Sequence, residues 1–271
     1  MRLVTFDSGD GPRAGLLLDD QVVAVEGAGD VGDLLRAGPL SKVTATGEPA
    51  PLSGVRLLPP VLTPSKIICI GLNYGAHAAE AGLEAPEAPT FFAKWANALA
   101  PPGADVPLPS FSEKVDYEAE VAFVIGSMAK DVSEEDALDR VAGYTLFNDL
   151  SARDYQFKTP QWMPGKVFDG SAPCGPALVT PDEAGSHDAI EIELRLNGET
   201  MQSASTADLV HSVPALVAYL STLMTLEPGD IVATGTPSGV GGTRDPRVWL
   251  KAGDEIEISS PTLGVLATRL G

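Results

Sequence analysis

Residues 115–126 read VDYEAEVAFVIG, and this stretch decides the fold. Its β-branched and aromatic residues predict a strand over residues 118–125. Because successive side chains of a strand point to opposite faces, Asp116, Glu118 and Glu120 are expected on one face and the apolar residues between them on the other. Carboxylates on one side of a core strand repel one another and lose hydration, and a divalent cation such as Mg²⁺ or Mn²⁺ relieves both costs. A strand with one solvated acidic face explains this segment alone equally well.

Outward from this strand, the chain reads as many short strands and few helices. Glycine and proline are frequent, at 28 and 23 residues, which suits short strands joined by turns. We therefore expect an α+β fold that is mainly β. Further strands are predicted over residues 66–71, 142–150, 190–196, 231–234, 255–259 and 265–270. Helices are predicted over residues 31–37, 73–81, 133–140 and 213–223.

The first part of the chain predicts a small β-rich N-terminal domain over residues 1–58. Its short apolar runs are interrupted by Asp, Ser and Gly, as in hairpins. Residues 57–64, LLPPVLTP, suit a linker because proline fixes φ and lacks a donor. We expect residues 59–271 to form the main domain.

Net charge and cysteine content limit the kinds of partner and the cellular compartment that we expect for this chain. The chain has 18 basic and 37 acidic residues, a formal charge of −19, which disfavours binding to nucleic acid or to a membrane surface. The two cysteines form no CxxC motif, so we expect neither a disulfide nor a thiolate zinc site. No apolar run near the N-terminus suits a signal peptide, and a cytoplasmic location is expected.

Polar residues in four other segments could serve chemistry. Asp149 ends the strand predicted over residues 142–150 and could be a third metal ligand. Arg153 and Gln156 follow it and could bind substrate, although a turn aspartate and a surface arginine are the better interpretation in isolation. His77 and Glu80 are three residues apart on a helix, where the carboxylate can orient the imidazole as a general base. An exposed pair is the alternative.

The other two segments are loops. Lys166 lies in a Gly/Pro/aromatic loop and could neutralise a substrate carboxylate or an enolate, unless it is merely solvated. In residues 230–242, backbone N–H groups and the Thr236 hydroxyl could hold an anionic oxygen, or the glycines could simply make a tight turn. Neither a P-loop nor a dinucleotide motif is present.

Taken together, these segments resemble the fumarylacetoacetate hydrolase superfamily over residues 66–271. The matching pieces are GLNYGAHAAE, DYEAEVAFVIG, FNDLSARDYQ, GKVFDGSAPCGP, LNGETMQ and LEPGDIVATGTPSGVG. The resemblance implies a mixed β-roll with a small N-terminal domain, assembled as a homodimer. It implies an Mg²⁺ or Mn²⁺ site and a catalytic and substrate-binding set, comprising metal ligands Glu118, Glu120 and Asp149, catalytic His77, Glu80 and Lys166, and substrate contacts Arg153, Gln156 and Thr236.

The reaction implied is metal-dependent cleavage of a C–C bond in a small 2-oxo acid, through an enolate that the metal stabilises. Acylpyruvate hydrolysis and oxaloacetate-type decarboxylation both fit, and the His77–Glu80 pair favours cleavage by activated water. An isomerase of the 2-hydroxyhepta-2,4-diene-1,7-dioate or 5-carboxymethyl-2-hydroxymuconate type, from aromatic catabolism, is the main rival. A non-catalytic binder of small acids is a third possibility, and the intact residue set argues against it.

Overall fold

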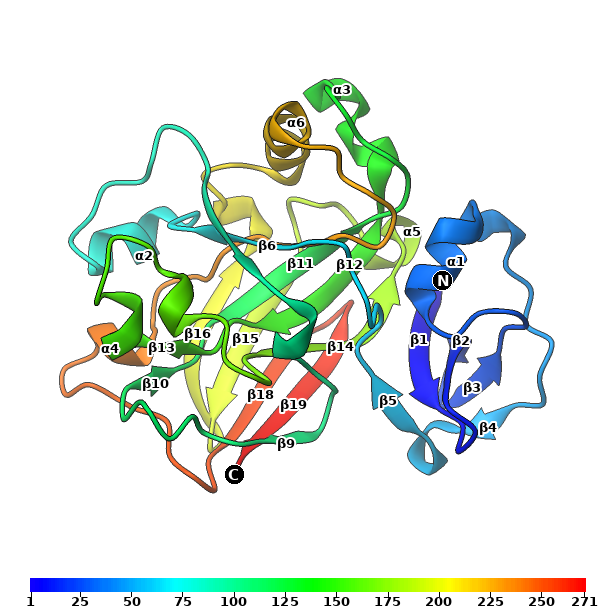
Figure 1. The fold of residues 1–271 in the computed structure, drawn as a ribbon, viewed down its shortest axis with the longest axis horizontal. Helices are drawn as coiled ribbons and strands as arrows, with labels where there is room; N and C mark the ends of the chain where they lie inside the picture. Colours follow the sequence, from blue (N-terminus) through cyan, green and yellow to red (C-terminus); the bar gives the residue numbers. More distant parts are fainter.

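The computed structural model describes residues 1–271 and consists mainly of strands (Figure 1). A 12-stranded sheet runs through the molecule, and a five-stranded sheet and a two-stranded ribbon accompany it. The large sheet has the order β4 (Ala50–Pro51), β3 (Gln21–Ala24), β2 (Pro12–Leu18), β1 (Arg2–Asp7), β14 (Ala172–Val179), β12 (Val141–Asn148), β11 (Ala119–Ile125), β17 (Ile231–Ala233), β6 (Ile67–Gly71) and β7 (Thr90–Lys94). Strand β5 (Arg56–Leu58) pairs with β1, and β8 (Leu99–Ala100) pairs with β14.

The smaller sheet is mostly antiparallel. Its order is β16 (Glu199–Ser205), β15 (Glu191–Leu196), β18 (Glu255–Ser260), β19 (Gly264–Leu270) and β9 (Ala104–Val106), of which β9 runs parallel to β19. The ribbon pairs β10 (Val115–Asp116) with β13 (Ser151–Ala152). The predicted architecture, α+β and mainly β, is confirmed.

Residues at the N-terminus extend the large sheet rather than forming a separate one. Figure 1 shows β1 to β5 and helix α1 (Val31–Ala37) as a lobe beside the main body. Strand β1 pairs antiparallel with β14, placing Leu3 opposite Leu178. The lobe is therefore joined to the main body by backbone hydrogen bonds as well as by the proline-rich segment.

Strand β11 lies at the centre of the core, and every one of its residues is buried. Val121 and Phe123 pack into one apolar cluster, whereas Ala122 and Val124 pack into another on the opposite face. Glu120 is only 1 % exposed and Glu118 only 5 %. The interpretation of a solvated acidic face is therefore wrong, because both faces of this strand are covered.

The longest helix, α6 (Val213–Leu223), forms as its sequence predicts. Ser212 caps it by accepting a hydrogen bond from the Ala215 N–H, and a proline occupies the first turn. The other helices are short: α2 (Gly75–Glu80), α3 (Glu134–Ala137), α4 (Arg153–Gln156) and α5 (Pro181–Ala184). In Figure 1, α3 and α6 lie together at one end of the molecule, and α2 and α4 lie on the side where β10 and β13 meet.

Two local features differ from the sequence prediction. Strand β14, which is not among the predicted strands, contains Pro173 and Pro176. It pairs with both β1 and β12, and a register shift in the pairing with β12 accommodates the irregular backbone. The strand expected from Asp116 onward is interrupted at Tyr117 and Glu118, between β10 and β11. Asp116 consequently does not share the acidic face of Glu118 and Glu120.

No helix in the structure combines the length and the apolar character needed to cross a bilayer.

Candidate active site

Three buried carboxylates meet where β11 begins and β12 ends. Glu118, Glu120 and Asp149 each place an oxygen within 4.8 Å of the others. Glu118 immediately precedes β11, Glu120 is its second residue, and Asp149 follows the last residue of β12. The Asp149 N–H donates to the Glu118 carbonyl at 2.9 Å, which keeps the two strand ends together. The structure therefore brings together the three residues predicted as metal ligands.

Three cationic side chains surround these carboxylates. Lys166 Nζ lies 2.8 Å from both Glu118 Oε2 and Asp149 Oδ2, and Arg153 Nη1 lies 2.6 Å from Glu118 Oε1. Lys94 Nζ lies 2.8 Å from Asp149 Oδ1, without the geometry of a hydrogen bond to that atom. Burial alone would raise the pKa of Glu118, but Lys166 and Arg153 hold it well below its usual range.

Glu120 is the carboxylate that lacks a cation of its own. Its only hydrogen-bond donor is the Gly235 N–H, at 2.9 Å. Burial raises the pKa of Glu120 well above its usual range, and the charges of Asp149 and Glu118 add to the shift. A hard divalent ion held by this cluster would offset the excess negative charge, so the residues present fit Mg²⁺ or Mn²⁺.

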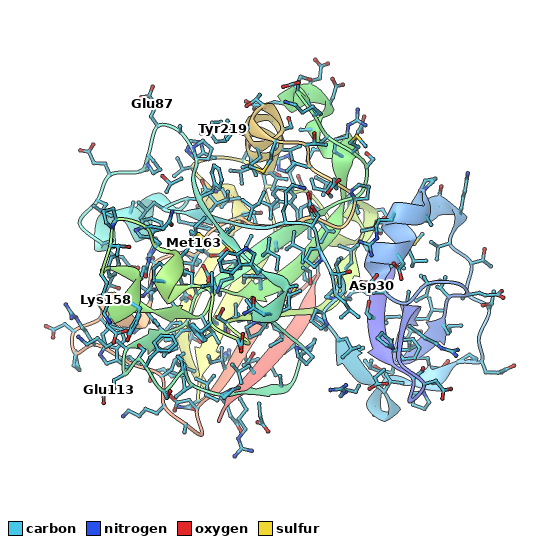
Figure 2. The ribbon with its side chains drawn as sticks, viewed as in Figure 1. Asp30, Glu87, Glu113, Lys158, Met163 and Tyr219 are labelled. Carbon is cyan, nitrogen blue, oxygen red and sulfur yellow. The ribbon has the colours of Figure 1, made fainter.

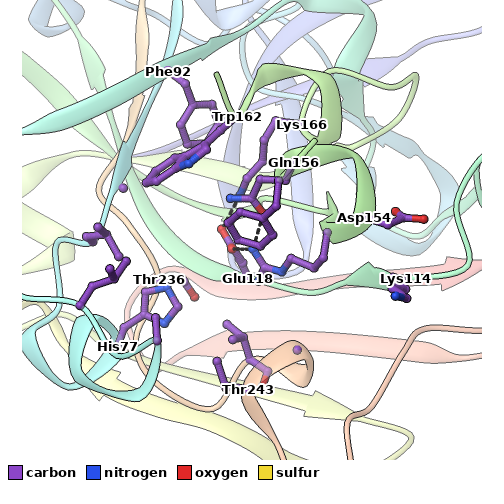
Figure 3. Close-up of a pocket in the computed structure, with 18 of the residues that line it drawn as sticks. His77, Phe92, Lys114, Glu118, Asp154, Gln156, Trp162, Lys166, Thr236 and Thr243 are labelled. Carbon is purple, nitrogen blue, oxygen red and sulfur yellow. Dashed lines mark hydrogen bonds and ion pairs between the residues drawn. The ribbon is translucent and has the colours of Figure 1, made fainter. Parts of the chain in front are cut away.

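The cluster opens onto a cavity of about 360 Å³ that holds most of the predicted site residues. Figure 3 shows Glu118 and Lys166 together on one wall, with His77 and Thr236 across from them. Aromatic side chains complete the walls, among them Phe92 and Trp162. The centroids of these two rings lie 6.1 Å apart in an edge-to-face arrangement. The cavity also includes Arg153 and Gln156.

His77 and Glu80 lie on helix α2, which covers this cavity. His77 Nδ1 is 2.8 Å from Glu80 Oε1, and the Gly239 N–H donates to both oxygens of the same carboxylate, at 3.1 and 3.0 Å. Burial opposes ionisation of Glu80, but the contacts with His77 and Gly239 keep its pKa below the usual value. Glu80 thus orients the imidazole and also fastens α2 to the glycine-rich loop.

Arg153 is fixed from two sides rather than left free for substrate. Its Nε and Nη2 lie 2.9 and 2.8 Å from Asp116 Oδ2, and its Nη1 donates to Gln156 Oε1 at 3.0 Å. Asp116 also accepts hydrogen bonds from the N–H groups of Gly241 and Gly242, at 2.7 and 2.9 Å. The carboxylate expected beside the metal ligands instead joins Arg153 to the glycine-rich loop.

Thr236 lines the cavity, and its hydroxyl is held by Gln202, a residue that the sequence analysis did not single out. Gln202 donates from Nε2 to Thr236 Oγ1 and to the Pro237 carbonyl, each at 2.8 Å, while its Oε1 accepts from the Ala119 N–H at 2.9 Å. Gln202 lies in the matched piece LNGETMQ, which was its only signal.

Lys94 is the other residue that sequence reasoning missed. Its side chain is fully buried, and its ammonium donates to the Ser171 carbonyl and hydroxyl, both at 2.9 Å, and to the Lys166 carbonyl. A lysine at the end of the apolar run TFFAK was a signal for a buried, paired charge.

Comparison with known proteins adds independent information on the family of this chain. Residues 66–271 match the family model described as fumarylacetoacetate (FAA) hydrolase C-terminal, and residues 1–60 match one described as Rv2993c-like, N-terminal. The chain is 40% identical to the mitochondrial oxaloacetate tautomerase fahd2 of Xenopus laevis, covering 98% of this chain and 89% of that protein.

Solved structures agree over the whole length. The 5-carboxymethyl-2-hydroxymuconate delta-isomerase of Mycobacterium smegmatis is 35% identical, with a TM-score of 0.85 and coverage of 100% of this chain and 99% of that one. The fumarylacetoacetate hydrolase of Exiguobacterium antarcticum is 32% identical, with a TM-score of 0.86 and the same coverage.

Proposed function

The chain belongs to the fumarylacetoacetate hydrolase family, and from that premise we propose that it interconverts the enol and keto forms of a small 2-oxo acid with the help of a divalent metal. One observation carries the proposal: the His77 imidazole faces the same cavity as Glu118 of the acidic cluster. A proton-transfer group therefore lies opposite a site that can stabilise negative charge. Relatives named as an oxaloacetate tautomerase and a hydroxymuconate isomerase support this class of reaction.

The proposed role of the chain's own residues follows from their contacts. His77 removes a proton from the carbon next to the 2-oxo group, and the enol forms when the resulting enolate oxygen takes a proton from the imidazolium or from water. The same steps in reverse return the keto form. Glu80 at Nδ1 favours the tautomer whose Nε2 accepts the proton. Lys166 places positive charge beside the developing enolate oxygen. A divalent ion bound by Glu118, Glu120 and Asp149 would supply further positive charge to that oxygen.

Charge balance supports an anionic substrate. In the connected group around the cluster, the carboxylates of Asp116, Glu118, Glu120 and Asp149 face the cations Lys94, Arg153 and Lys166. One negative charge is in excess, and a bound divalent ion turns it into one positive charge. A 2-oxo acid carboxylate then enters a site of opposite sign.

Cleavage of a C–C bond is the second candidate, because it passes through the same enolate. The His77–Glu80 pair could activate water for attack on a distal carbonyl, and the similar fumarylacetoacetate hydrolase supports that chemistry. The sequence alone favoured cleavage. The similarity to proteins named as a tautomerase and an isomerase favours proton transfer as the first candidate.

One experiment tests the first candidate and ranks it against the second. Enol loss and pyruvate release from oxaloacetate are followed in parallel, in metal-stripped protein with and without Mg²⁺ or Mn²⁺. We expect metal-dependent enol loss that outpaces pyruvate release, and a decrease of about 10²–10⁴-fold in His77→Asn. His187→Asn, a histidine outside the cavity, is the matched control. Pyruvate release as fast as enol loss would favour cleavage, and no metal-dependent change in either signal would refute both.

The homodimer implied by the family resemblance is also a proposal. Trp95, which is 55% exposed and does not line the cavity, offers apolar surface that such an assembly could cover. Sedimentation of the purified chain tests it, and a single species with the mass of one chain would contradict it.

A further inference from the structure

Leu72 has a backbone conformation that leucine rarely adopts. Its φ is 57°, in the left-handed region, where the Cβ of an L-residue comes too close to the following carbonyl oxygen. The other non-glycine residues with positive φ are Asp19, Asp131 and Asn197, whose short polar side chains tolerate this region better. Glycine would be the least strained residue at this position. The sequence therefore keeps a leucine where its backbone is unfavourable.

Neighbouring residues hold this conformation in place. Asn73 is fully buried, and its side-chain amide donates to the carbonyls of Thr234 and His211, at 2.8 and 3.0 Å. Its Oδ1 accepts from the His211 N–H at 2.7 Å. Gly235 packs so closely on the same turn that a Cβ there would lie 3.0 Å from both the Asn73 Cβ and the Ile70 carbonyl oxygen. The turn is ordered, and its surroundings impose the unfavourable φ.

Leu72 marks the point where the chain leaves the large sheet to cover the cavity. Strand β6 ends at Gly71, which pairs with Thr90 at the start of β7. Between these two residues the chain forms α2, and Figure 2 shows Glu87, on the same excursion, at the outer edge of the molecule. Leu72 is the first residue of this excursion, and it lines the cavity.

Core packing does not explain why this position carries a leucine. The residue is half-buried, it belongs to neither of the two apolar clusters of the core, and it does not pack against either of them. Trp162, by contrast, lines the same cavity and packs against one of the clusters. The apolar surface of Leu72 is therefore available to a ligand in the cavity.

We infer that Leu72 is a specificity-determining residue, whose side chain contacts the carbon chain of the substrate beyond C3. The inference rests on the proposed function, which places the carboxylate and 2-oxo group at the acidic cluster and Lys166. Those polar atoms are common to all 2-oxo acids, so their contacts do not distinguish one chain from another. An apolar wall does, because each methylene group that becomes fully buried strengthens binding by about fourfold.

Thermal unfolding of the Mg²⁺-loaded full-length protein tests the backbone part of the inference. At an ordinary position alanine gives a more stable protein than glycine, but at positive φ the order is reversed, because alanine keeps the Cβ. We expect Leu72→Gly to have a higher Tm than Leu72→Ala and to stay within about 5 °C of wild type. Leu18→Gly and Leu18→Ala, at an exposed leucine outside the cavity with negative φ, should show the ordinary order.

Binding of matched probes tests the side-chain part. Mg²⁺-loaded full-length protein is titrated calorimetrically with pyruvate and with 2-oxohexanoate, which share the carboxylate and 2-oxo group and differ only in the length of the apolar chain. Wild type should prefer 2-oxohexanoate by about 10-fold, because the chain is partly enclosed. Both Leu72 variants should reduce that preference to below about 3-fold. Their affinity for oxalate, a probe without a chain, should stay within about 2-fold of wild type.

Other outcomes overturn the inference. A Leu72→Gly protein that does not fold, that is less stable than Leu72→Ala, or that has a Tm more than about 5 °C below wild type would show that the leucine is needed for packing. Equal losses of affinity for oxalate and 2-oxohexanoate would assign Leu72 to the shape of the whole cavity.

The remaining outcomes separate this inference from the proposed function. If wild-type protein binds oxalate but does not prefer 2-oxohexanoate to pyruvate, or if the Leu72 variants keep the preference, the role of Leu72 is refuted and the proposed function stands. If metal-loaded wild-type protein binds neither oxalate nor the oxo acids, the proposed function fails and the role of Leu72 fails with it.

Discussion

Lys94 offers a severe test of how the buried charges are balanced. Its ammonium, fully buried, contacts Asp149 Oδ1 at 2.8 Å and donates to three backbone carbonyls, those of Leu150, Lys166 and Ser171. Lys94→Met keeps the length and apolar stem of the side chain but removes the charge and every donor. Asp149 then keeps only Lys166 as a cationic partner.

The expected loss of stability is large. Removing one partner of a buried ion pair costs about 3–5 kcal/mol, because the other charge is left in a poorly solvated site. The three backbone carbonyls that lose their hydrogen-bond donor add to this cost, while relaxation of the structure around the methionine thioether offsets part of it. We therefore predict a loss of about 4 kcal/mol, against a total stability of about 5–15 kcal/mol for a typical protein.

Urea unfolding of the metal-free protein measures this loss. With a slope of about 3 kcal/mol per molar urea, the midpoint should fall by more than about 1 M. Lys42→Met is the control, since Lys42 is exposed and forms no ion pair, and its stability should stay within about 0.5 kcal/mol of wild type. A Lys94→Met protein within about 1 kcal/mol of wild type would refute the charge balance described for the site.

Three further predictions concern the cavity wall, the acidic cluster and helix α2. Gly71→Ala should destabilise the fold by about 1–3 kcal/mol and alter tryptophan fluorescence, because its Cβ would lie 2.3 Å from the Trp162 ring. Gly54→Ala, with open space around its Cβ, should do neither. Burial raises the pKa of Glu120, so the free energy of unfolding of the metal-free protein should decrease as the pH rises through that pKa. In Glu120→Gln the free energy of unfolding should depend less on pH. Mg²⁺ should not raise the Tm of this variant. Contacts with His77 and Gly239 lower the pKa of Glu80 from 4.5, so the stability that Glu80 contributes is present above that pH and is lost as pH falls through the lowered value. Hydrogen exchange in α2 should then accelerate, and an unchanged rate would contradict the role of Glu80 in holding α2 to the glycine-rich loop.

Much of the fold could be predicted from local patterns. The helix at Val213–Leu223 formed with the expected bounds, because capping by Ser212, a proline in the first turn and a one-sided apolar stripe all agree. Strand β14 could not be predicted, since its prolines are tolerated only through a register shift that depends on its neighbours.

The candidate site shows the same division. The alternation of Glu118 and Glu120 predicted that these two carboxylates share a face, but Asp149 was assigned to the same site only through the family resemblance. Lys94 and Gln202 were missed because each acts through partners distant in sequence, which no local pattern reveals. Asp116 was misassigned because the strand breaks at Tyr117, where pairing passes from β13 to β12.

Proton exchange at the carbon next to the 2-oxo group tests the central claim most directly. Metal-loaded protein is incubated with 2-oxohexanoate in D₂O, and loss of the C3 proton signal is followed by NMR. The account predicts exchange that requires the divalent ion, is lost in Glu118→Gln and is strongly slowed in His77→Asn. Protein that binds the metal and the oxo acid yet leaves the C3 protons unexchanged would contradict it.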